Sequence, residues 1–68
     1  MSAPFAVGDL VVVSRQAPRY TQAMFARETG EVVEIVDALT VVVAFAGVRV
    51  LGYRNEFRRL RRAEEEGS

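Results

Sequence analysis

The 68-residue chain contains neither cysteine nor histidine. It therefore cannot form a disulfide, hold zinc through a thiolate or an imidazole, or supply a cysteine nucleophile or a histidine base. Its carboxylates are scattered, and none stands beside a nucleophile in a catalytic pattern. Asp9 is expected to hydrogen-bond its own turn, and Glu31 and Glu34 to face water. We expect a protein that is not an enzyme and that holds no cofactor and no metal.

Long apolar runs and an excess of one charge are also missing. The longest unbroken apolar stretch, from Val41 to Val48, is far short of the roughly 20 residues that cross a membrane. Nine basic residues, all arginine, balance nine acidic ones, whereas dedicated nucleic-acid binders usually carry a basic excess. These features favour a cytoplasmic protein whose partner is another protein rather than a nucleic acid or a membrane.

The composition divides the chain into one small domain and two ends. We expect residues 1–4 to form a flexible leader and residues 5–62 a single small β-barrel domain. Residues 63–68 contain three consecutive glutamates and are expected to form an acidic flexible tail. A chain of this length buries only about 60% of its unfolded surface, so its core must be small.

Short runs of β-branched residues, separated by turn residues, predict five strands. The expected strands are Asp9–Arg15, Glu31–Val36, Thr40–Phe45, Val48–Tyr53 and Phe57–Arg61. The second and third are close enough along the chain to pair antiparallel. Between the first two, Gln16–Thr29 predicts a long loop with room for one helical turn, and Arg54–Glu56 predicts a 3-10 turn.

So few strands can bury a common core only by bending into a small barrel. A set of large apolar side chains is expected to point inward and to form this core. They are Phe5, Val11, Val13, Val32, Ile35, Val41, Val43, Phe45, Val50, Phe57 and Leu60.

Glycines at turns and alternating apolar residues recur in a characteristic order. They run Phe5, Gly8, Asp9, Val11, Val13, then Gly30, Val32, Ile35, then Val41, Val43, Phe45. This order resembles bacterial Src-homology-3-like and KOW-type barrels. The segments at positions 30–36 and 54–57 are similar to the variable chain of ferredoxin:thioredoxin reductase and to a small barrel subunit of photosystem I. The resemblance implies an all-β, five-stranded Src-homology-3-like barrel with a long first loop, a 3-10 turn before the last strand and a binding role, but it assigns no site.

The long loop carries arginine, aromatic and methionine side chains, which are enriched in the centres of protein interfaces. We expect Arg19, Tyr20 and Phe25, together with Leu51 of the fourth strand, to anchor a larger protein. The alternative is that Met24 and Phe25 fold back and plug one end of the barrel.

The strands also hold more apolar residues than one inward face can use. Those left to point outward are Leu10, Val12, Val42, Ala44 and Leu51. An exposed patch of this kind marks a surface for a partner or for self-association, unless loops and termini cover it.

Arginines gather near the end of the domain, at Arg54, Arg58, Arg59, Arg61 and Arg62. With Tyr53 or Tyr20 stacking on bases, they would define a KOW-type barrel that binds RNA or DNA through its phosphates. As solvated charges on an edge strand, they would instead prevent sheet-to-sheet aggregation. The leading hypothesis is a non-enzymatic protein-interaction module, a small regulatory or accessory protein that binds a larger protein, and nucleic-acid binding is the alternative.

Overall fold

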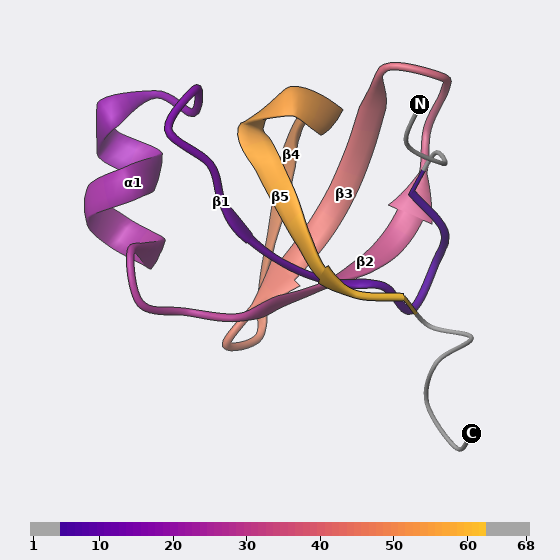
Figure 1. Ribbon diagram of the computed structural model, residues 1–68, viewed down its shortest axis with the longest axis horizontal. Helices are drawn as coiled ribbons and strands as arrows, with labels where there is room; N and C mark the ends of the chain where they lie inside the picture. The colour runs from indigo at the N-terminus through magenta and orange to yellow at the C-terminus, as the bar shows by residue number, and fades with distance from the viewer. Residues whose placement is uncertain (1–4, 63–68) are drawn as a thin grey trace.

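The computed structural model describes residues 5–62, where the chain forms five strands and two short helical segments (Figure 1). The strands are β1 (Leu10–Val13), β2 (Gly30–Ile35), β3 (Thr40–Phe45), β4 (Val48–Tyr53) and β5 (Phe57–Arg61). The helix α1 (Arg19–Phe25) lies between β1 and β2, and the 3-10 turn η1 (Arg54–Glu56) lies between β4 and β5. The expected leader and tail lie outside the described residues.

All five strands belong to one antiparallel sheet in the order β4-β3-β2-β1-β5. The all-β class and the antiparallel pairing of the second and third expected strands are confirmed. The first strand is internal to the sheet, because β1 pairs with both β2 and β5. Across residues 5–62 no ladder joins β4 to β5, so these two strands are the edges of an open sheet.

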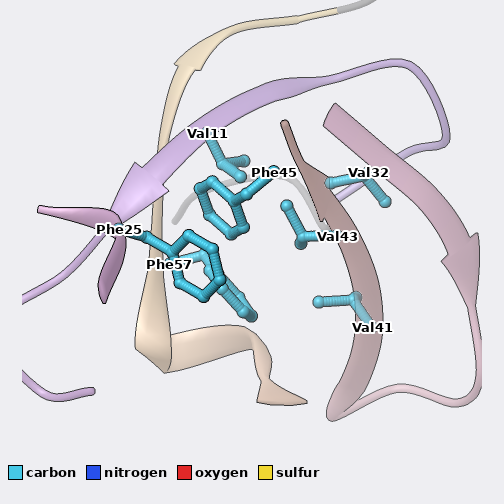
Figure 2. Packing of buried hydrophobic residues seen from close by; sticks show 7 residues of the cluster. All are labelled: Val11, Phe25, Val32, Val41, Val43, Phe45 and Phe57. Carbon is cyan, nitrogen blue, oxygen red and sulfur yellow. The ribbon is translucent and has the colours of Figure 1, made fainter. Parts of the chain in front are cut away.

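The core fills the inner side of this bent sheet (Figure 2). Its buried members are Val11, Phe25, Val32, Val41, Val43, Phe45 and Phe57. The ring of Phe45 stacks on Phe25 with centroids 4.7 Å apart, and its centroid lies 6.1 Å from that of Phe57. One phenylalanine of β3 therefore joins α1 and β5 into the same core. Phe5, Val13 and Val50 are half-buried and pack against this cluster.

Two of the side chains expected to point inward are exposed. Ile35 pairs with the buried Val41 and so lies on the inner side, but it is the last residue of β2 and stays 40% exposed. The prediction for Leu60 is wrong: it is 54% exposed because side chains alternate along β5, where Phe57 and Arg59 face inward and pair with Val13 and Val11. The inward position after Phe57 therefore belongs to Arg59.

The long first connection contains a seven-residue helix, where the sequence indicated a loop with one helical turn. So short a helix is unstable alone and depends on tertiary contacts. Thr21 and Phe25, four residues apart, are buried on its inner side. The Gln22 side-chain amide donates hydrogen bonds to the carbonyl oxygens of Arg15 and Ala17, at 3.2 and 2.7 Å. These contacts hold α1 beside β1 (Figure 1).

The core reaches the backbone of β2 at Gly30. A Cβ atom placed there would lie 2.7 Å from a ring carbon of Phe45 and even closer to a methyl group of Val43. This distance is shorter than van der Waals contact, so the site accepts only a residue without a side chain.

Candidate interaction surfaces

The outer side of α1 presents the side chains that the sequence indicated for partner binding. Tyr20 and Met24 are four residues apart and are 70% and 65% exposed. Residues at this spacing lie on one helix face, and Arg19 at the start of the helix is also exposed. Because Thr21 and Phe25 are buried in the domain, they hold the helix backbone that carries these three side chains in place.

Phe25, the third loop residue expected at a partner surface, is buried against Phe45. Of the two interpretations left open by the sequence, its position fits the plug at one end of the core. Met24 does not share that position, because its side chain faces solvent. The surface of α1 therefore consists of Arg19, Tyr20 and Met24.

Leu51 belongs to a second surface, on the outer side of the sheet. It is 66% exposed and pairs with the half-buried Val42 of β3. Tyr53, two residues further along β4, is 61% exposed and pairs with Thr40. Alternate residues of paired strands share one face, so Leu51, Tyr53 and their two partners project from the same face of the sheet. We call the outward side of β2, β3 and β4 the outer sheet face.

A shallow pocket of about 330 Å³ lies beside Tyr53, at the end of β4. Its walls are Leu39, Tyr53, Arg54 and Asn55. The pocket is shaped by η1, where the backbone N–H of Arg54 donates to the carbonyl oxygen of Leu39 at 2.8 Å. The carboxylate of Glu56 accepts the N–H of Tyr53 at 3.0 Å, which fixes the tyrosine backbone at the pocket edge.

The arginines near the end of the domain do not form one surface. Arg59 points inward, where its Nε lies 3.2 Å from Oδ2 of the buried Asp9 and its guanidinium lies 5.3 Å from the centre of the Phe5 ring. Arg58, the next residue back, points the other way and is exposed, as are Arg54, Arg61 and Arg62. One of the five candidate phosphate ligands is thus committed to an internal ion pair.

The Asp9–Arg59 pair is the site that sequence reasoning missed. Asp9 accepts the backbone N–H of Ala6 at 2.9 Å, which confirms the expected turn, but its carboxylate also meets an arginine 50 positions away. The available signal was the alternation from Phe57 to Arg59, which places both on one side of β5. The strong preference for burying Leu60 obscured it.

The carboxylate of Asp37 organises the connection between β2 and β3. It accepts the backbone N–H groups of Leu39 and Thr40 at 2.9 and 3.0 Å. The hydrogen bond from Leu39 is the main cause that lowers the pKa of Asp37 below its ordinary value, because hydrogen bonds to a carboxylate favour the ionised form. Within residues 5–62, no three acidic side chains come close enough together to hold a metal ion.

Comparison of the chain with known protein families, with characterised proteins and with solved structures finds no match. No helix in the described part of the chain has the length and apolar character needed to cross a membrane. Function must therefore be inferred from the two surfaces themselves, that of α1 and that of the outer sheet face.

Proposed function

We propose that the chain is a small Src-homology-3-like module of the cytoplasm with no catalytic role, which binds a larger protein through α1. The antiparallel strand order, the long first connection and the 3-10 turn before the last strand support this fold assignment. They agree with the barrel that the sequence motifs resemble. The outward residues of α1 supply the proposed contact.

The observation that carries the proposal is the division of α1 into two faces. Thr21 and Phe25 fix one face to the domain, and Tyr20 and Met24 leave a tyrosine and a methionine in solvent on the other. Aromatic, methionine and arginine side chains are the types that dominate interface centres. A helix that is already anchored loses little conformational freedom when it docks, which favours binding.

The test compares matched variants on the two surfaces. A tagged chain is used to capture partners from a lysate of its native host, with the partners identified by mass and then purified for direct titration. We expect Tyr20→Ala and Arg19→Ala to weaken binding by about tenfold or more, since tyrosine and arginine are frequent hot spots. Tyr53→Ala on the outer sheet face and Arg54→Ala in the adjoining 3-10 turn remove the same residue types away from α1 and serve as controls.

Thermal unfolding separates binding from folding. Tyr20 and Arg19 are exposed, so both variants should unfold within a few degrees of the parent chain. A large loss of thermal stability would make these residues structural. Equal loss of binding in the Tyr53 and Arg54 variants would move the partner site away from α1.

A second candidate function, single-stranded nucleic-acid binding, is favoured by one observation. Tyr53 and Arg54 are exposed side by side at the mouth of the pocket, the combination of a stacking ring and a phosphate ligand. Titration of RNA and DNA oligonucleotides at several salt concentrations tests it. For a nucleic-acid binder, the logarithm of the binding constant should fall linearly with the logarithm of the salt concentration. Arg54→Ala should reduce the magnitude of that slope by about 1, the value for one phosphate contact. The absence of binding at low salt eliminates this candidate.

A further inference from the structure

The outer sheet face carries charges of opposite sign on its two sides. Glu31 of β2 pairs with Ala44 of β3, and Ala44 pairs with Arg49 of β4. The three residues form one row across the sheet, acidic at one end, small in the middle and basic at the other. Glu31 and Arg49 are exposed, and neither takes part in an ion pair within residues 5–62.

The next row along the strands is mostly apolar. Two residues of β2, Val33 and Glu34, stand opposite Val42 because of a bulge, and Val42 pairs with Leu51. Val33 and Val42 are half-buried, and Leu51 is exposed. Among the described residues, α1 packs mainly against β1 and η1 against β5, so neither helical segment lies over this row.

The last row is apolar at both ends. Val36, one residue beyond β2, donates its backbone N–H to the carbonyl oxygen of Thr40 at 3.0 Å, and Thr40 pairs with Tyr53. Val36 and Tyr53 are both exposed. The three rows together carry both charges of opposite sign at one end of the strands and are mainly apolar over the remainder, where Glu34 is the one charged side chain.

This arrangement is complementary to itself. Consider a twofold axis that runs parallel to β3, midway between two facing sheets. This axis places β2 of one copy opposite β4 of the other and keeps each row at the same level along the strands. In two copies related in this way, Glu31 of each copy meets Arg49 of the other, Val42 meets Val42, and Tyr53 meets Val36. We propose that the outer sheet face is the contact surface between two copies of this chain, packed face to face about such a twofold axis.

General features of sheets and charges support the proposal. Sheets that pack face to face keep their strands roughly aligned and lie about 10 Å apart, a gap that glutamate and arginine side chains can bridge from both sides. A twofold dimer uses the same patch on both copies, which requires this kind of self-complementarity. The full chain has zero formal net charge, so no overall repulsion opposes its association. The face is only three strands wide, and we expect a weak dimer.

The test exchanges the two charges separately and then mixes the products. Glu31→Arg places arginine opposite arginine at both contacts of the dimer, and Arg49→Glu places glutamate opposite glutamate. Each variant alone should therefore associate at least about tenfold more weakly than the parent chain, because like charges in contact are strongly unfavourable. In an equimolar mixture both contacts become arginine to glutamate, and a heterodimer should form with an affinity close to that of the parent dimer.

Sedimentation equilibrium at chain concentrations from about 10 µM to 1 mM covers the range expected for a weak interface. Glu28→Arg and Arg27→Glu make the same changes of charge at exposed positions outside the outer sheet face. Their mixture measures any attraction that comes from net charge alone. Circular dichroism shows whether each variant keeps the parent fold, and Leu51→Asp, which puts a carboxylate into the apolar row, provides a further disruption of the contact.

The outcomes are distinct. A parent chain that stays monomeric throughout overturns the proposal. Association that ignores Glu31→Arg points instead to edge-to-edge pairing through β4, since Glu31 would then lie outside the contact. Failure of the mixture to associate, or equal association in the control mixture, overturns the twofold arrangement. None of these results depends on Arg19 or Tyr20, so partner binding through α1 stands or falls separately.

Discussion

The two sides of β3 have similar composition and opposite environments. Its inward residues, Val41, Val43 and Phe45, are buried beneath α1 and β5, whereas Thr40, Val42 and Ala44 alternate with them and are only half-buried. Hydrophobic content alone therefore does not decide which side becomes the core of this small domain. The inner side is decided by what the rest of the chain can place over it, and the outer side remains partly exposed.

The largest expected difference between the sides comes from removing a large side chain. Phe45→Ala empties the centre of the core, where the ring contacts Phe25 and Phe57, and should lower the free energy of unfolding by about 3–5 kcal/mol. Leu51→Ala on the outer side should change it by no more than about 0.5 kcal/mol. Urea unfolding at a dilute, monomeric concentration measures both, and similar losses would contradict the distinction between the sides.

Removing the inward charge should have the next largest effect. Arg59→Met leaves the buried carboxylate of Asp9 without its arginine, and we expect a loss of about 2–3 kcal/mol in the free energy of unfolding. Arg58→Met removes the same charge from the outward neighbour and should cost less than about 0.5 kcal/mol. If both substitutions had the same effect, the pair with Asp9 would contribute nothing specific.

Enlarging a small side chain should also affect stability differently on the two sides of the sheet. Gly30→Ala forces a Cβ atom against Val43 and Phe45, and we expect a loss of about 1–3 kcal/mol because an already packed core must shift. Ala44→Val adds two methyl groups on the outer side, where half-exposed valine suits a strand, and should change stability little. Chemical unfolding of the two variants in parallel tests this comparison.

The turn between β3 and β4 sets the pairing register of these strands, and this register decides which of their side chains face inward. Ala46 and Gly47 have φ angles of 49° and 86°, a left-handed conformation that alanine adopts with strain. Ala46→Asn should raise the free energy of unfolding by about 0.5–1 kcal/mol, since asparagine tolerates this conformation better. Thermal unfolding should show a higher midpoint, and an unchanged or lower midpoint would place the strain elsewhere.

The smallest effect is expected outside both sides, at the connection between β2 and β3. The lowered pKa of Asp37 means that folding favours its ionised form, so its contribution is present at neutral pH and is lost as the pH falls through the lowered pKa. Asp37→Asn should remove this small part of the acid sensitivity. Melting temperatures of parent and variant between neutral and acidic pH measure it, and parallel curves would contradict a pH-dependent contribution from Asp37.

The strand positions could be predicted from sequence because they depend on local signals. Runs of valine, glycine at turns and alternation placed every strand within two residues of its observed bounds. The helix was underestimated because its stability comes from contacts outside the helix, where Phe25 stacks on Phe45 and Gln22 donates to the carbonyl oxygens of Arg15 and Ala17. Such contacts leave no periodic pattern in a seven-residue segment.

The candidate surfaces were predictable only in part. Exposure of Leu51 agrees with the expected excess of outward apolar residues in the strands. Alternation from Phe57 predicts that Arg59 points inward, but the sequence alone could not reveal that the buried carboxylate of Asp9, 50 positions away, would lie beside it. The row from Glu31 through Ala44 to Arg49 was equally hidden. Its members come from three strands, and the pairing register that aligns them is a property of the sheet.

The pairing of β1 with β5 also determines when the domain can be completed during synthesis. The first strand is made early, yet one of its two neighbours is the last strand, and the contact between Asp9 and Arg59 spans 50 positions. Until β5 has been made, one side of β1 lacks its partner and Phe57 is missing from the core. The hairpins of β2, β3 and β4 can form first, because their contacts are local. The fold is complete only after β5 has been made and pairs with β1.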